Sequence, residues 1–422
     1  MVLLLIGILW LVSSRHSTNK SEAVKTPATP PSTASPSTTS PPTTSPSSVS
    51  VPPSAVSVHI VGDHLVNASG EHIRLLGVDA SGTQESCIRD QGFSPGSLNS
   101  TEAEAIASWH INAVRVPLNE DCWLGINGAP ASYSGANYQS AIRAWVTALN
   151  NAGMIAILDL HWGAPGTYPA TGEWPMADED HSVTFWAEVA KAYASTPGVI
   201  FDLYNEPYLG HTHPTTADWS CWLNGCTNTT TLSATSPHAR ALVPYQTAGM
   251  QQLVNTVRAA GAKQPIMIGG LNFAGDPCGL SDKGGNGGVC EQLAYLPKDP
   301  LDQLAISFHT YLPNSSCTTE SCWNAFTQAA DAANIPIITG EFGEKDCSDA
   351  YMDSYMTWAD QNDVSYLAWT WNVNQSRACR VGNDRANHYL LRSYDGTPTA
   401  VSPNGANYKA HLATLSADAP SS

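Results

Sequence analysis

The sequence has few charged residues, and those it has are mostly acidic. Asp, Glu, Lys and Arg make up 13% of the 422 residues, and 36 acidic residues against 19 basic ones leave a formal net charge of −17. A chain with this charge repels nucleic acid and anionic polysaccharides. We therefore expect no nucleic-acid partner and favour a neutral substrate, although acidity that serves only solubility explains the charge equally well.

The sequence also lacks an apolar run long enough for a comfortable membrane span. The apolar run over residues 1–12 is short, and no basic residues precede it as in a typical signal sequence. We interpret residues 1–14 as a signal peptide or signal anchor. The protein is then extracellular, either secreted or tethered to the cell surface by an uncleaved N-terminal segment.

Charged and aromatic residues are absent from residues 26–57, which contain only Pro, Ser, Thr, Ala and Val. Such a segment cannot bury enough apolar surface to offset the entropy lost on ordering. We predict a disordered Pro/Ser/Thr-rich linker over residues 15–57. It would hold the following domain away from a membrane or cell wall.

No Cys-x2-Cys pair is present, which argues against a structural zinc site. The even number of cysteines, 10, favours disulfides and an oxidising compartment. Spacing alone does not determine connectivity. As the simplest pairing we expect local bridges Cys221–Cys226, Cys278–Cys290 and Cys317–Cys322, with Cys87–Cys122 and Cys347–Cys379 joining neighbouring loops.

After residue 57, strand-like and helix-like patterns alternate along the chain. Strands are predicted over residues 73–79, 113–117, 155–160, 199–204, 265–269, 304–311, 336–341 and 366–372. Helices are predicted over residues 101–110, 137–152, 181–194, 237–260, 321–333 and 351–362, where apolar residues recur every three or four positions. Eight strands with helical crossovers predict an α/β fold, a single (β/α)8 TIM barrel forming one catalytic domain over residues 58–422. Residues 58–70 resemble a hairpin that closes the barrel floor.

Two glutamates follow apolar, strand-like runs. Glu206 lies in VIFDLYNEP and Glu341 lies in PIITGEFG. The rim at the carboxyl ends of parallel strands is where barrel enzymes build their active sites. Two carboxyl groups facing each other there can cleave a glycosidic bond, one protonated to assist the leaving oxygen and one ionised beside the anomeric carbon.

Other polar and aromatic residues stand near the ends of the remaining predicted strands. They are Arg115, His161, Asn205, His309, Tyr311 and Trp369. Trp371 shares the predicted orientation of Trp369 on its strand, so either could be the platform for a sugar ring, and we favour Trp369. Trp162, Trp123, Trp174, Trp219 and Trp222 lie in predicted rim loops, where aromatic faces could stack on β-linked sugars.

With these motifs in this order, the chain resembles glycoside hydrolase family 5, the cellulase-like retaining β-glycanases of clan A. The resemblance covers residues 58–415. It implies that Glu206 is the acid/base on the fourth strand, that Glu341 is the nucleophile on the seventh, and that the polar residues above form the substrate-binding shell.

Elementary electrostatics agrees with these roles. Two close carboxylates repel each other, which raises the pKa of one of them. We expect Arg115 and a hydrogen bond from Tyr311 to keep Glu341 ionised, so that Glu206 carries the proton. Asn205 could donate to the sugar 2-hydroxyl, and we expect His161 and His309 to position sugar hydroxyls and the acid.

The resulting hypothesis is a monomeric endo-β-1,4-glucanase of cellulase type that binds a polysaccharide or oligosaccharide and needs no metal or cofactor. A β-mannanase or an exo-acting β-glucosidase of the same fold is the alternative within enzymes. A surface glycan-binding protein without turnover is the alternative of another class, and a metal-dependent hydrolase using His161 and His309 is a third. A membrane or cell-wall tether through the N-terminus completes the expected partners.

Overall fold

The computed structural model describes residues 56–210, 214–229, 243–275, 278, 290–313, 315–373, 388–399 and 404–418. The segment predicted over residues 1–14, and all but the last two residues of the predicted linker, lie outside this part of the chain. Within it, no helix combines the length and the apolar character needed to cross a bilayer.

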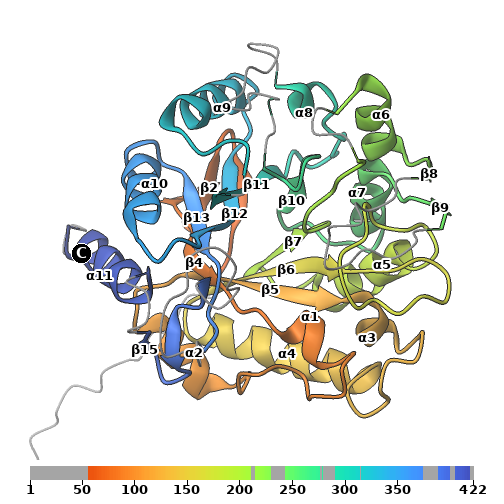
Figure 1. Ribbon diagram of the computed structural model, residues 1–422, viewed down its shortest axis with the longest axis horizontal. Coiled ribbons are helices and arrows are strands. Elements are labelled where there is room, and N and C mark those ends of the chain that lie inside the picture. Colours follow the sequence, from red (N-terminus) through yellow and green to blue (C-terminus); the bar gives the residue numbers. More distant parts are fainter. Residues whose placement is uncertain are drawn as a thin grey trace, which may run out of the picture. The chain divides into compact units, whose positions relative to one another are not determined.

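Eight parallel strands close into a barrel, and the helices lie outside the ring of strands (Figure 1). Around the barrel the strand order is β4, β5, β6, β7, β10, β11, β12, β13 and back to β4. Their bounds are β4 Leu76–Asp79, β5 Ala113–Asn119, β6 Ile155–Trp162, β7 Val199–Asp202, β10 Ile266–Gly269, β11 Leu304–Leu312, β12 Ile337–Glu344 and β13 Ser365–Ala368. The predicted (β/α)8 barrel is confirmed.

The outer helices each turn one apolar face toward the strands. They are α2 Ser100–Ala107, α4 Ala136–Asn151, α5 Ser182–Tyr193, α7 Met250–Ala259, α9 Glu320–Ala332, α10 Ala350–Gln361 and α11 Asn404–Asp418. In α4 the buried residues include Tyr138, Ile142, Trp145 and Leu149, which recur with the helical period. Four further helices, α1 Thr83–Ser86, α3 Glu120–Leu124, α6 Thr216–Asn224 and α8 Glu291–Ala294, lie in the connections.

The interior of the barrel changes from apolar to polar along the strands. In β6 the alternate residues Ile155 and Ile157 belong to an apolar cluster at the amino-terminal ends of the strands. The next two residues of the same alternation, Asp159 and His161, are buried polar side chains. Because alternate residues of a strand point to the same face, one side of β6 supplies both the apolar floor and the polar layer above it.

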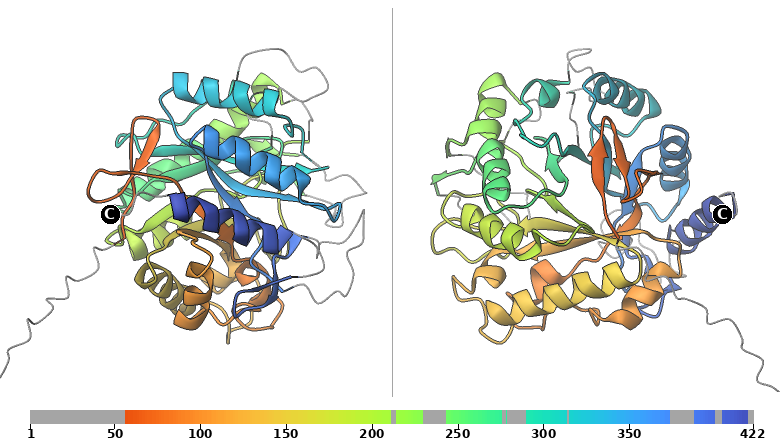
Figure 2. Two further views of the ribbon diagram at one scale, coloured as in Figure 1. Left: turned by 90° about the vertical axis from the view of Figure 1, so that its left-hand side faces the viewer. Right: turned by 180° about the vertical axis from the view of Figure 1, so that it is seen from behind.

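A small antiparallel sheet covers the amino-terminal end of the barrel (Figure 2). It consists of β1 His59–Val61, β2 His64–Val66 and β3 His72–Ile73. Val58, Ile60 and Leu65 pack into the same apolar cluster as Ile157. The predicted floor hairpin is therefore confirmed, with a third short strand added. Two further strand pairs, β8 Thr227–Asn228 with β9 Tyr245–Gln246 and β14 Leu391–Ser393 with β15 Thr397–Pro398, stand apart from the barrel.

Several element predictions were wrong in their bounds. The strand predicted over 73–79 begins at Leu76, and the helix predicted over 101–110 ends at Ala107. The helix predicted over 237–260 begins only at Met250, because residues 245–246 pair as β9 and Gly249 caps the helix; residues 237–242 lie outside the described part. The strand predicted over 366–372 ends at Ala368. The strand predicted over 336–341 continues to Glu344, so that Glu341 lies within β12 and not at its end.

Four of the five predicted disulfides are present. They are Cys87–Cys122, Cys221–Cys226, Cys278–Cys290 and Cys317–Cys322. The fifth predicted pair includes Cys379, which lies outside the described residues.

Candidate active site

Glu206 and Glu341 meet above the polar layer of the barrel. A carboxylate oxygen of each and a ring nitrogen of His309 all lie within 4.8 Å of one another. Nδ1 of His309 is 3.0 Å from Oε1 of Glu206 and 3.8 Å from Oε2 of Glu341. Glu341 lies in β12, His309 lies in the adjacent strand β11, and Glu206 lies four positions beyond the end of β7. The barrel thus brings residues 206 and 341 together.

Glu341 receives two strong hydrogen bonds. Nη1 of Arg115 donates to its Oε1 at 2.7 Å, and the hydroxyl of Tyr311 donates to its Oε2 at 2.6 Å. Both contacts predicted for Glu341 are present. Donors aimed at a carboxylate stabilise its negative charge, and Glu341 receives two of them.

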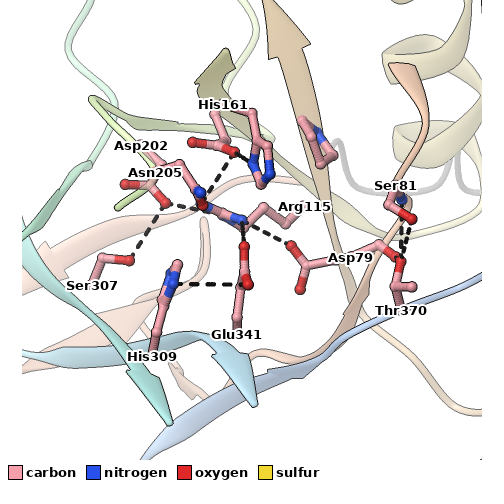
Figure 3. A network of polar contacts seen from close by, with 12 residues as sticks. Asp79, Ser81, Arg115, His161, Asp202, Asn205, Ser307, His309, Glu341 and Thr370 are labelled. Atoms are coloured by element: carbon pink, nitrogen blue, oxygen red, sulfur yellow. Dashed lines mark hydrogen bonds and ion pairs between the residues drawn. The ribbon is translucent and has the colours of Figure 1, made fainter. Parts of the chain in front are cut away.

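Arg115 lies at the centre of a buried carboxylate cluster (Figure 3). Besides Glu341, its guanidinium contacts Asp79 at 3.0 Å, Asp159 at 3.1 Å and Asp202 at 3.0 Å. Burial raises the pKa of Asp159 to about 7 and that of Asp202 to about 6, although the charge of Arg115 opposes both shifts. The guanidinium of Arg115 therefore pairs with several carboxyl groups whose pKa values are raised by burial.

Burial shifts the pKa of Glu206 and the pKa values of the two cleft histidines in opposite directions. The pKa of Glu206 is raised to about 7, chiefly by burial and against the positive charges of Arg115 and Lys345. Burial lowers the pKa of His161 and of His309 to about 4. At neutral pH both imidazoles are uncharged, and Glu206 can carry a proton.

A cleft of about 650 Å³ opens over these groups, a typical size for a ligand site. Of the predicted residues, its lining includes Glu206, Glu341, His161, His309, Tyr311, Trp162 and Trp369. The ring of Trp369 stacks on that of His161 at 5.5 Å and 9°. His161 is held in turn by Asp159, whose Oδ2 lies 2.6 Å from Nδ1 of the ring.

Three predicted substrate-binding residues do not line the cleft. Arg115 is fully buried below it, and its contacts are to carboxylates and to the amide oxygen of Asn205. Asn205 is 1% exposed, and its amide lies between Arg115 (2.8 Å) and Glu173 (3.1 Å). Trp371 is 1% exposed and packs edge-on against Trp109 at 5.0 Å. Because β13 ends at Ala368, strand alternation does not extend to residues 369 and 371, and the two tryptophans point to different places.

The loop tryptophans predicted as sugar platforms are mostly core residues. Trp123, Trp219 and Trp222 are at most 1% exposed, and the indole nitrogen of Trp222 donates to the backbone of Gly269. Trp174 packs beside Trp162 in an apolar cluster. Among the five predicted rim tryptophans, Trp162 alone lines the cleft.

The sequence interpretation missed several cleft residues. Glu173 lines the cleft and lies 4.0 Å from Nε2 of His161. Lys345 directly follows β12 at the rim, so the rule that selected Glu341 could have found it. Phe273 is 43% exposed in the cleft wall and stacks on Tyr208. No periodic signal marks Glu173 or Phe273, because both lie in irregular loops.

A model of the family described as "Cellulase (glycosyl hydrolase family 5)" matches residues 66–375. The chain belongs to this family. Two curated relatives are endoglucanase CelA of Streptomyces lividans, 24% identical over 366 residues, and endoglucanase MaCel5A of Microbulbifer sp. (strain ALW1), 20% identical over 325 residues. The matches cover 85% and 75% of this chain but only 64% and 51% of the relatives.

Solved structures share the fold. The β-glucanase SdGluc5_26A of Saccharophagus degradans in complex with cellotetraose has a TM-score of 0.56 at 17% identity, covering 86% of this chain and 94% of its own. The catalytic domain of Thermobifida fusca endoglucanase Cel5A has a TM-score of 0.55 at 17% identity, covering 85% and 97%. At these identities the likeness concerns the fold alone.

The raised pKa of Glu206 predicts how activity depends on pH. We expect Glu206 to act as the general acid, which must be protonated, so kcat/KM should fall about tenfold per pH unit above a pKa of about 7. The charge of Lys345 lowers this pKa. A Lys345→Met variant should therefore shift the falling limb to higher pH, measured on a neutral oligosaccharide. The exposed Lys191 on α5 provides the matched control, and a Lys191→Met variant should leave the profile unchanged.

Proposed function

We propose that this protein is an extracellular, retaining endo-β-1,4-glucanase. The observation that carries the proposal is the approach of Glu206 and Glu341, in which one carboxylate oxygen of each lies within 4.8 Å of the other. Retaining glycosidases hold their two carboxyl groups about 5–5.5 Å apart, whereas inverting enzymes leave about 6.5–9.5 Å for a water molecule. The short separation supports direct attack by a carboxylate.

In the first step, an oxygen of Glu341 attacks the anomeric carbon and the bond to the glycosidic oxygen breaks. Glu206 gives its proton to that oxygen, so the leaving sugar departs with a hydroxyl group. In the second step, Glu206 removes a proton from water, and the hydroxide oxygen displaces Glu341 from the anomeric carbon. Two inversions restore the original configuration, and both carboxyl groups end in their starting states.

Each neighbouring residue has a place in this scheme. Arg115 and Tyr311 hold Glu341 and disperse its charge, while His309 contacts Glu206 at 3.0 Å and orients it. Trp369, half-exposed in the cleft, would stack on a sugar ring. Asn205 is held by Arg115 and Glu173, so its influence on the 2-hydroxyl would depend on those contacts.

The substrate is inferred from several independent features. The net charge of −17 disfavours an anionic glycan. Both curated relatives are named endoglucanases, and one structural neighbour holds cellotetraose.

The four disulfides are typical of an oxidising, extracellular location. We further propose a monomer that the N-terminal segment can tether to a membrane or cell wall.

Product analysis tests the endo-acting assignment. We expect the viscosity of carboxymethyl cellulose to fall steeply while few reducing ends form, and cellopentaose to be cut at internal linkages with the β-anomer appearing first by NMR. Preference for a soluble mannan would favour the β-mannanase, and release of single glucose units alone would favour the exo-acting enzyme. Binding without turnover would reject the enzyme.

A further inference from the structure

Two histidines and an aspartate meet at the opposite end of the barrel from the cleft. Nε2 of His72 lies 2.9 Å from Oδ2 of Asp363, and Nδ1 of His64 lies 3.8 Å from the same oxygen. One nitrogen of each ring and a carboxylate oxygen all lie within 4.8 Å of one another. From this juxtaposition we infer that His64, His72 and Asp363 bind a divalent transition-metal ion, with Zn²⁺ as the best fit.

The fold holds the three side chains together from two separate parts of the chain. β2 and β3 pair antiparallel, with Leu65 opposite Ile73. Leu65 and Ile73 face the apolar floor cluster, so the residues that precede them, His64 and His72, face outward on the same side of the sheet. The third group, Asp363, lies in the turn between α10 and β13.

The backbone of Asp363 supports its role in this turn. Its φ is 59°, in the left-handed region that aspartate and asparagine enter more readily than most residues. The turn directs the carboxylate toward His72, which belongs to a sheet more than 280 residues earlier in the chain. A metal ion bound there would cross-link the floor sheet to the turn that precedes β13.

The donor set suits zinc. Two imidazoles and one carboxylate form a common tetrahedral zinc set when water takes the fourth position. The histidine and aspartate side chains are about half exposed, with 53%, 43% and 45% of their surfaces accessible, so water can reach the ion. Mg²⁺ and Ca²⁺ prefer all-oxygen sets and fit less well.

An outer carboxylate completes the arrangement. Oδ1 of Asp63 lies 3.4 Å from Nε2 of His64, on the side of the ring away from Asp363. A carboxylate on the second nitrogen of a ligating histidine fixes the tautomer and makes the ring a better donor. Asp331 lines the same depression, so the neighbourhood is negative and attracts a cation.

A simple ion pair between His72 and Asp363 is the competing explanation. It would need neither His64 at the same oxygen nor Asp63 behind His64. The two explanations predict different responses to zinc. If the contact is only an ion pair, zinc would disrupt it; if it is a metal site, zinc would bind all three side chains.

Zinc titration of the full chain tests the inference. After removal of bound metal with a chelator, isothermal titration calorimetry at pH 7.5 should show one zinc site per chain assigned to the floor, and zinc should raise the Tm. His72→Ala and Asp363→Asn variants should each bind zinc at least about tenfold more weakly, and an Asp63→Asn variant about tenfold more weakly. The asparagine at position 363 keeps a residue suited to a positive φ, so that the fold is preserved.

Two controls separate this site from others. Glu206, His309 and Glu341 form a second group of ligand atoms within 4.8 Å in the described part of the chain, so zinc could also bind in the cleft. The titrations are therefore repeated with a Glu206→Gln/Glu341→Gln double variant, which should keep the floor site. A His110→Ala variant removes an exposed histidine that is not part of the cluster and should bind as the parent does. Equal zinc affinity in the parent, His72→Ala and Asp363→Asn proteins would overturn the inference, as would the loss of all binding in the double variant.

Discussion

A Glu341→Gln variant is expected to lose at least about 10⁴-fold in kcat on cellopentaose, a loss typical of removing a catalytic nucleophile. The amide keeps the size of the side chain, and its single oxygen can still accept one of the two hydrogen bonds that Arg115 and Tyr311 donate to the carboxylate at 2.7 Å and 2.6 Å. It cannot form the glycosyl-enzyme. Initial-rate measurements check the loss, and thermal unfolding checks that the fold is intact.

The partner variant, Glu206→Gln, should behave differently. Loss of a general acid costs about 10²–10⁴-fold on a natural glycan, whose leaving oxygen needs the proton. An aryl glycoside with a good leaving group does not need it in the first step, so a burst of phenol should precede slow release of the sugar. Equal losses on both substrate types would contradict the assigned roles.

Azide distinguishes the two positions by product. In a Glu206→Ala variant, azide attacks the glycosyl-enzyme without needing a base and should yield the β-glycosyl azide. In a Glu341→Ala variant, azide attacks the activated substrate directly and should yield the α-azide. Reversed configurations, or more than a tenth of parent activity in Glu341→Gln, would show that the site is assigned wrongly.

An Arg115→Met variant is expected to be both unstable and inactive. Removing one partner of a buried ion pair costs about 3–5 kcal/mol, because the remaining charges have no compensation. Here one guanidinium contacts Asp79, Asp159, Asp202 and Glu341. Urea denaturation with circular dichroism measures the loss of stability, and the aryl glycoside measures the loss of activity.

The same cluster gives the stability a definite pH dependence. Asp159 and Asp202 have folded pKa values of about 7 and about 6, above the ordinary value of 3.8. The folded state therefore binds more protons, and the stability from these groups is complete below pH 4 and is lost as the pH rises to about 7. Without Arg115 the buried carboxylates lose their cation, so the Arg115→Met variant should lose stability more steeply over this range.

Arg258 offers the matched control. Its guanidinium contacts the carboxylate of Asp299 at 2.8 Å, far from the cleft lining. Asp299 also accepts hydrogen bonds from backbone groups, so an Arg258→Met variant leaves it partly satisfied. We expect a smaller loss of stability and unchanged kcat per folded molecule. An Arg115→Met protein that matched this control would show that the cluster is not specially dependent on Arg115.

Local patterns were sufficient to predict the barrel and most of its rim. Polar residues at or near the ends of apolar runs identified His161, Glu206, His309, Tyr311 and Glu341, and all five line one cleft. This succeeds because parallel strands bring their carboxyl ends to one rim whatever the loops between them do. The same rule could have added Asp79 and Asp202, the last residues of β4 and β7.

Orientation at the ends of elements was not predictable in the same way. Trp369 and Trp371 are two positions apart and have the same predicted orientation. In the structure Trp369 stacks on His161 in the cleft, whereas Trp371 is buried against Trp109. Beyond the last strand residue the backbone no longer alternates regularly, so spacing carries no information about direction. Loop residues such as Glu173 are placed by contacts with distant side chains and leave no local signal.

The sequence by itself determined the alternation that closes the barrel, the family and the pair of glutamates, since each depends on local chemistry or on motifs in order. Only the tertiary structure decided that Arg115 lies beneath the cleft and that burial raises the pKa of Glu206 to about 7. It alone brought His64 and His72 to Asp363. Burial and the distances between charged groups depend on residues that are remote in the chain. Both are therefore defined only once the chain has folded.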